Sequence, residues 1–156
     1  MTTLAKSLRG DNIKRLRLRD VCEADPFTPI EEVVRRMSAR KTGCVLILEN
    51  DRLIGIFTER DFLSRVIAQG MDVSLPVGPV MTKAPKTIAH HASVHSAVDI
   101  MESGGYRHLP VIGEHDKPIG VLSVRDIVHY LVEYFPAKVY NLPPTPDQTQ
   151  PSREGA

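Results

Sequence analysis

The strongest constraint on the fold is an internal repeat, because a duplicated sequence forms the same local structure twice. The segments Gly55–Asp61 (GIFTERD) and Gly120–Asp126 (GVLSVRD) share one pattern: glycine, two apolar residues, a hydroxyl residue, any residue, arginine and aspartate. Each segment follows an apolar run and precedes a helical pattern. The chain therefore contains two similar units in tandem.

Each half has the pattern of an extended entry, a helix, two strands joined by a polar turn, and a second helix. Thr28 and Pro29 are typical of a helix cap and a first helical position, and Glu31 completes a capping box. The strands are apolar on both faces, which indicates a sheet covered on both sides. The predicted helices span Pro29–Ala39, Glu59–Gln69, Ser93–Ser103 and Val124–Tyr134, and the predicted strands include Cys44–Leu48, Leu53–Phe57 and Leu109–Ile112.

Neither half, at roughly 60 residues, buries much apolar surface alone, so we expect the halves to pack together as one pseudo-symmetric α+β structure. The predicted organisation is a basic arm over residues 1–17, a first unit over 18–72, a second unit over 73–136 and a tail over 137–156. The basic residues of the arm predict a solvated, partly disordered segment. The tail is rich in proline and polar residues, a composition that does not build a core.

Charge and composition disfavour several classes of protein. The formal net charge is +1, so no overall field favours nucleic acid or an anionic membrane. The apolar runs are too short to span a bilayer and the N-terminus lacks the apolar segment of a secretory signal, which favours a cytoplasmic protein. Cys22 and Cys44 form no Cys-x-x-Cys pattern, and we expect two free, buried thiols.

The repeated segment places polar side chains where a strand ends and a helix begins. A helix N-terminus offers free N–H groups and a positive dipole end to a phosphate, and hydroxyl and arginine side chains add further donors. An aspartate in the first helical turn can accept hydrogen bonds from both hydroxyls of a ribose. The candidate residues are Thr58, Arg60 and Asp61 in the first copy and Ser123, Arg125 and Asp126 in the second.

Helix capping is the competing interpretation of the same residues, because Thr58-x-x-Asp61 and Ser123-x-x-Asp126 are also ordinary capping patterns. Capping does not require the same glycine, arginine and aspartate around both hydroxyls. The duplication therefore favours ligand binding.

Two units of this layout, with the run Tyr106–Val111 (YRHLPV), resemble the cystathionine beta-synthase (CBS) domain family. The resemblance covers about Leu18 to Tyr134 and is to a stand-alone tandem pair. It implies β-α-β-β-α units that pack through their sheets and bind adenosyl ligands in two clefts between them.

The resemblance also implies roles for individual residues. Thr58 and Ser123 would contact phosphate or ribose, and Asp61 and Asp126 the ribose hydroxyls. Arg107 and His108 resemble positions that reach polyphosphate from within the cleft, as do the helix-start residues Arg60 and Arg125.

The two units differ where they would contact phosphate, since Thr42-Gly43-Cys44 aligns with Tyr106-Arg107-His108. A charge-assisted hydrogen bond to phosphate contributes about 1.5–3 kcal/mol. We therefore expect two clefts of unequal affinity.

Neither a metal centre nor a catalytic site is expected. His91 and His95 would share a helix face, but the aligned helix begins near Ser93, and no further nearby cysteine or carboxylate completes a tetrahedral set. No Ser-His-Asp order, carboxylate pair or activated cysteine indicates catalysis, and no cofactor is required.

The sequence thus predicts a regulatory module that binds an adenosine nucleotide (AMP, ADP or ATP) and acts on a separate, unidentified protein. An apolar stripe near the end of the second unit is suited to a homodimer contact, with ordinary core packing as the alternative; it comprises Ile127, Val128, Leu131, Val132, Tyr134 and Phe135. Two other functions stay open. One is a ligand-independent dimerisation or protein-interaction module, and the other, less favoured, is nucleic-acid binding through the basic arm.

Overall fold

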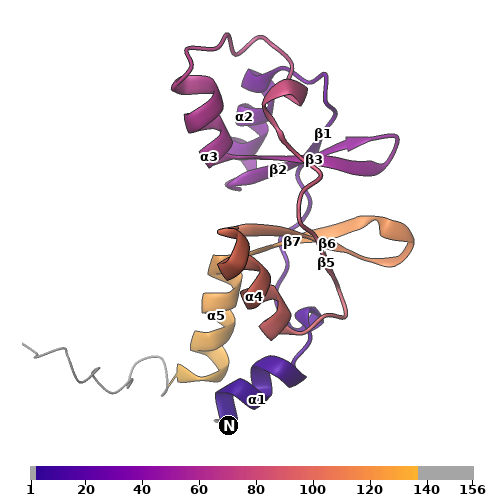
Figure 1. Ribbon diagram of the computed structural model, residues 1–156, viewed down its shortest axis with the longest axis vertical. Helices are drawn as coiled ribbons and strands as arrows, with labels where there is room; N and C mark the ends of the chain where they lie inside the picture. The colour runs from indigo at the N-terminus through magenta and orange to yellow at the C-terminus, as the bar shows by residue number, and fades with distance from the viewer. Residues whose placement is uncertain (1–2, 137–156) are drawn as a thin grey trace, which may run out of the picture.

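Two small sheets face each other at the centre of the molecule, and helices pack on the other face of each sheet (Figure 1). The computed structural model describes residues 3–136. Side chains of strand β2 (Cys44–Glu49) alternate between two cores. Val45 and Ile47 pack with the helices of the first unit, whereas Cys44 and Leu46 pack against Val121 of the second sheet. The predicted packing of two α+β units through their sheets is confirmed.

The two units repeat the same element order. The first comprises β1 (Glu23–Ala24), α2 (Ile30–Arg40), β2 (Cys44–Glu49), β3 (Arg52–Thr58), α3 (Glu59–Asp61) and the π-helical turn η2 (Phe62–Ile67). The second comprises β5 (Ile88–Ala89), α4 (Val94–Gly104), β6 (His108–Ile112), β7 (Pro118–Ser123) and α5 (Val124–Tyr134), with a short 3-10 turn η4 (Glu114–Asp116) between β6 and β7. In each unit the first strand runs parallel to the second, and the second and third form an antiparallel hairpin.

The segments that lead into the two units are exchanged between them. β4 (Thr82–Lys83), which precedes the second unit, pairs with β3 of the first, and Arg19, which precedes the first unit, bridges to Val121 in β7 of the second. A Cβ at Gly55 would lie 2.3 Å from Met81 Sδ, and one at Gly120 would lie 3.0 Å from Leu18 Cβ. The glycine that opens each repeat therefore leaves room for the close passage of the exchanged segment.

The prediction of a solvated, partly disordered arm before residue 18 is wrong for the described residues. Helix α1 (Thr3–Gly10) and the 3-10 turn η1 (Ile13–Arg15) pack on the second unit, where Ile13 is fully buried. The Val94 N–H donates to the Asp11 carbonyl, and the Tyr130 hydroxyl donates to the Asp11 carboxylate. Ile13 corresponds to Val77, which directly precedes the 3-10 turn η3 (Gly78–Val80) and is equally buried in the first unit. The arm therefore belongs to the repeat.

Two local predictions also need correction. Helix α2 begins at Ile30 without a side-chain cap, because the Ile30 and Glu31 N–H groups donate instead to the carbonyls of Leu75 and Val73. The predicted helix over 59–69 is α-helical only to Asp61 and then widens into η2. Gly70 has a φ of 61°, as expected for a residue that ends a helix.

The cysteine prediction is confirmed, since both thiols are free and buried. Burial raises the pKa of the Cys44 thiol to about 12. No helix within residues 3–136 has the length and apolarity needed to cross a membrane. The predicted tail, residues 137–156, lies outside the described residues.

Candidate functional site

The hydroxyl and aspartate of each repeat form a capping box at a helix start. Asp61 N–H donates to Thr58 Oγ1 at 3.2 Å, and Thr58 N–H donates to Asp61 Oδ2 at 3.0 Å. The Ser123–Asp126 pair has the same bonds, at 3.2 and 2.7 Å. The capping interpretation is therefore correct for both copies.

Capping nevertheless leaves one oxygen of each carboxylate for other contacts. Asp61 Oδ1 accepts a hydrogen bond from the Thr82 hydroxyl at 3.1 Å, and Arg65 Nε lies 3.7 Å away. Asp126 Oδ1 lies 3.7 Å from Arg19 Nε. Because capping uses Oδ2 and these contacts use Oδ1, the same aspartate can cap its helix and bind a ligand.

A cleft between the units contains most of the predicted site residues. This Asp61 cleft has a volume of about 320 Å³ and is bounded by the end of β3 and the start of α3 from the first unit and by the segment between α4 and β6 from the second. Five of the eight predicted residues line it, namely Thr58, Arg60, Asp61, Arg107 and His108. The fold thus joins the ribose-type and phosphate-type candidates across the two units.

The second cleft, which we call the Asp126 cleft, is built from different side chains. It has a volume of about 780 Å³, and its lining includes Thr42, which aligns with Tyr106 of the other unit. Arginine side chains from the lead-in segment and from α2 also line it, namely Arg15, Arg17, Arg19 and Arg40. The two clefts are therefore unequal in structure, although the Asp126 cleft is not poor in positive charge.

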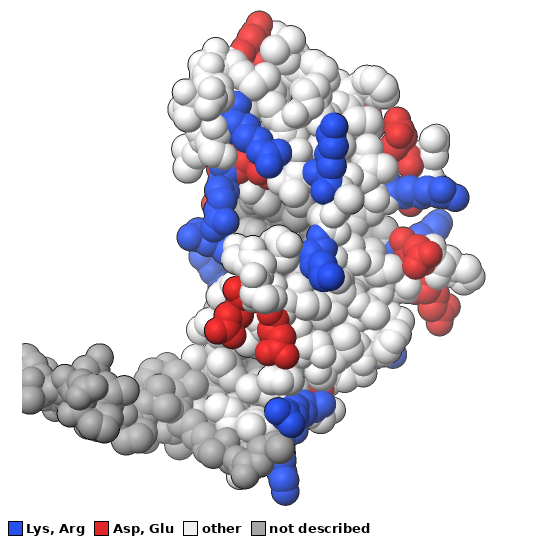
Figure 2. All heavy atoms as spheres, in the orientation of Figure 1, with Lys and Arg blue, Asp and Glu red and all other residues white. Residues whose placement is uncertain are grey.

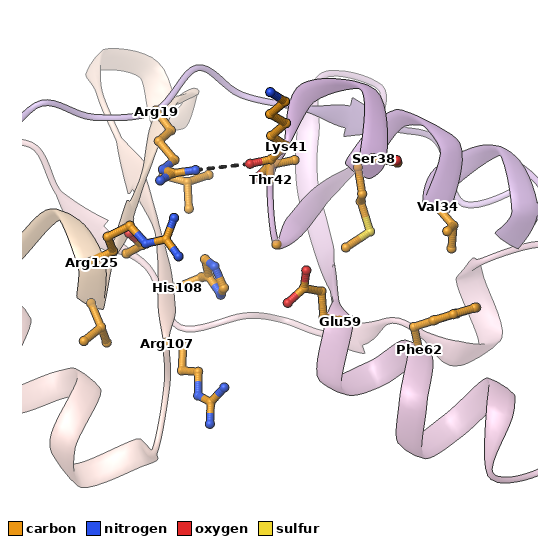
Figure 3. A pocket seen from close by; sticks show the side chains of 15 residues that line it. Arg19, Val34, Ser38, Lys41, Thr42, Glu59, Phe62, Arg107, His108 and Arg125 are labelled. Carbon is orange, nitrogen blue, oxygen red and sulfur yellow. Dashed lines mark hydrogen bonds between the residues drawn. The ribbon is translucent and has the colours of Figure 1, made fainter.

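A third cavity, the central pocket, lies between the units and shares lining residues with each of the two clefts (Figure 3). Its volume is about 640 Å³; it shares Arg107 and His108 with the Asp61 cleft and Arg19 and Thr42 with the Asp126 cleft. Of the three remaining predicted residues, Ser123 and Arg125 line this pocket and Asp126 lines the Asp126 cleft.

Positive charge dominates the central pocket. Arg19, Lys41, Arg107 and Arg125 line it, and Glu59 is the one carboxylate among the described lining residues. No described residue makes an ion pair or hydrogen bond with the side chains of Lys41, Arg107 or Arg125. Figure 2 shows basic side chains on both sides of the junction between the units. The pocket is therefore suited to a polyanion such as a phosphate chain.

The His108 imidazole packs against Gly43, where there is no side chain to crowd it. A Cβ at Gly43 would lie 3.1 Å from His108 Nε2. Burial lowers the pKa of the half-buried imidazole below its ordinary value, and the Glu59 carboxylate partly opposes this shift. The free protein therefore favours neutral His108.

Sequence reasoning missed two residues that contact the helix-start aspartates from the lead-in segments, Thr82 and Arg19. These two residues reach the aspartates because the exchanged segments pair with the opposite unit. A local repeat pattern does not reveal that pairing. Three His, Cys, Asp or Glu side chains suited to a metal ion do not come together anywhere in residues 3–136.

The geometry defines a class: a tandem pair of α+β units with ligand-sized clefts at their junction. The CBS domain model matches twice, over residues 13–68 and 77–133, and the chain belongs to this family. The expected family membership is confirmed.

Relatives support the same assignment. An uncharacterised 17.7 kDa protein of Acidianus ambivalens is 34% identical over 109 residues, covering 69% of this chain and 65% of that protein. A CBS-domain protein of Agrobacterium tumefaciens is 34% identical with a TM-score of 0.65, covering 72% and 90% of the two chains. A CBS domain protein of Pyrobaculum aerophilum, solved with AMP, is 26% identical with a TM-score of 0.70, covering 79% and 99%. The chain spans less than two thirds of the length of the first curated relatives that it matches.

Proposed function

We propose that this chain is a regulatory module that binds an adenosine nucleotide in the Asp61 cleft and acts on a separate protein. One observation carries the proposal: Thr58 and Asp61 of the first unit lie in the same cleft as Arg107 and His108 of the second. A ligand held by both units stabilises one arrangement of the pair, which is how a small molecule shifts a conformational equilibrium.

The chemistry of the cleft fits the parts of a nucleotide. Asp61 Oδ1 accepts from Thr82 and has further acceptor capacity for a ribose hydroxyl. Ile56 and the half-exposed ring of Tyr106 provide apolar surface for a base. Arg107 lies where the cleft meets the central pocket, so a phosphate chain would extend toward the unpaired cations there.

The AMP complex of the Pyrobaculum protein supports this class of ligand. The central pocket has room and positive charge for more than one phosphate.

Isothermal titration calorimetry tests the proposal with adenosine, AMP, ATP and S-adenosylmethionine. We expect saturable binding in the micromolar range that Asp61→Asn weakens strongly. The matched control is Asp51→Asn, which makes the same change in the exposed turn between β2 and β3. The proposal is wrong if no adenosine compound binds at millimolar concentration.

We further propose that two copies associate through the helical side of the pair. Leu63 and Ile67 on η2 and Val124 and Val128 on α5 are exposed apolar side chains, and both helices lie on the same side of the molecule (Figure 1). Leu63 and Val128 occupy equivalent positions of the repeat, so the surface suits a two-fold contact.

Light scattering after gel filtration tests this association. We expect a dimer that the double variant Leu63→Glu/Val128→Glu converts to a monomer. Phe27→Glu changes an exposed aromatic ring outside this surface and should leave the dimer intact. A dimer without any nucleotide response would instead favour the ligand-independent interaction module.

A further inference from the structure

Arg19 and Thr82 occupy the same position in the two halves of the fold. Thr82 pairs with Ile56 in β3, and Arg19 pairs with Val121, the residue of β7 that corresponds to Ile56. Both side chains reach the Oδ1 atom of the helix-start aspartate in the unit that they pair with. The first cleft thus has a neutral hydroxyl at this position, and the second has a guanidinium.

The Arg19 side chain also spans the Asp126 cleft. Its Nε lies 3.7 Å from Asp126 Oδ1 in the second unit, and its Nη1 donates to the Lys41 carbonyl of the first unit at 3.3 Å (Figure 3). The Asp126 side chain is only 9% exposed. The free Oδ1 of Asp126, which a ribose would need, therefore already faces an internal cation.

Arg65 does not have the same effect on the Asp61 cleft, although its Nε lies 3.7 Å from Asp61 Oδ1. Its Nη1 donates to the carbonyls of Val80 and Met81 at 3.2 and 2.8 Å, so the guanidinium is anchored to the linker that packs on its own unit. Arg65 thus balances the charge of Asp61 without linking the two walls of the cleft.

We propose that Arg19 is an internal occupant of the Asp126 cleft, so that the chain binds one adenosine nucleotide, in the Asp61 cleft, and excludes a second. This inference rests on the proposed function and adds which cleft is used and why. A ribose entering the Asp126 cleft has to displace a charged group that contacts both units, whereas in the Asp61 cleft it meets a hydroxyl and an arginine that is anchored to its own unit. Arg19 is therefore the residue that sets the stoichiometry.

Titration calorimetry with AMP on the full chain and its Arg19→Thr variant tests this inference. Threonine reproduces Thr82 of the other cleft, and we expect the stoichiometry to rise from one to two nucleotides per chain. The added site should disappear in Arg19→Thr/Asp126→Asn. Arg19→Gln, which keeps most of the side-chain length without the charge, should also bind two and provides a second variant if threonine impairs folding.

Arg17→Thr is the matched control, because Arg17 lines the same cleft but does not contact Asp126. This variant should bind one nucleotide, and a second site appearing in it would show that general charge, not Arg19, closes the cleft. Two nucleotides on the wild-type chain, or one on both Arg19 variants, overturn the inference but leave the proposed function intact. If the wild-type chain binds none, the proposed function fails, and the Arg19 variants decide the inference alone: a site that appears in them supports it, and none refutes it.

Discussion

Arg107→Ala should separate the recognition of phosphate from that of adenosine. The Arg107 side chain is exposed, lines both the Asp61 cleft and the central pocket, and has no hydrogen-bond or ion-pair partner among residues 3–136. Its removal therefore breaks no hydrogen bond or ion pair of the free protein, and we expect the free energy of unfolding to stay within about 0.5 kcal/mol of wild type.

The loss in binding follows from one charge-assisted hydrogen bond. Such a bond contributes about 1.5–3 kcal/mol, and the exposure of Arg107 places it near the lower value. A loss of about 1.4 kcal/mol is a tenfold rise in the dissociation constant. AMP affinity should therefore fall about tenfold, whereas adenosine, which lacks the phosphate, should bind the variant as it binds wild type.

Calorimetric titrations of both ligands against wild type, Arg107→Ala and Arg52→Ala provide the measurement. Arg52 is an exposed arginine at the start of β3, at the turn with β2 and away from the Asp61 cleft, and its variant should bind both ligands normally. Equal losses for AMP and adenosine in Arg107→Ala would refute the assignment of Arg107 to phosphate.

Three further changes test other parts of the structure. Ile13→Ala should lower the free energy of unfolding, measured in urea, by about 2–5 kcal/mol because Ile13 is fully buried in the second unit. A loss near zero would show that the arm is a solvated segment after all. Gly43→Ala should displace the His108 side chain and so weaken AMP binding several-fold, as measured by calorimetric titration. An unchanged affinity would contradict this prediction. Burial lowers the pKa of His108, so its contribution to stability is present above pH 6.5 and is lost as the pH falls toward the folded-state pKa. His108→Gln should flatten that part of the stability profile measured in urea, and an unchanged profile would assign the pH dependence to other groups.

The repeat predicted the elements well because their local signals are strong. Helix α5 has the predicted bounds, α2 and α4 are displaced by a residue, and the capping boxes at Thr58 and Ser123 form as their spacing indicates. The errors lie where a distant segment replaces a local partner. Thr28 does not cap α2, since the linker carbonyls of Leu75 and Val73 are available to its first N–H groups.

The arm was misjudged for a related reason. Ile13 and Leu16 stand among arginines and lysines, and a local pattern of this kind is typical of a solvated segment. Their apolar partners are in the second unit, far along the chain, as the presence of Ile13 and Val94 in one core shows.

The sequence by itself determined the two units, their α+β elements and the paired hydroxyl and aspartate at each helix start, because these depend on hydrophobic periodicity and on contacts within a few residues. Only the tertiary structure decided which residues share a cleft. It brought Arg107 and His108 of the second unit to Asp61 of the first, and it placed Arg19 against Asp126. Those contacts arise from the exchange of lead-in segments between two sheets, and the free energy that drives this exchange is the burial of side chains such as Ile13 and Val77 in the opposite unit.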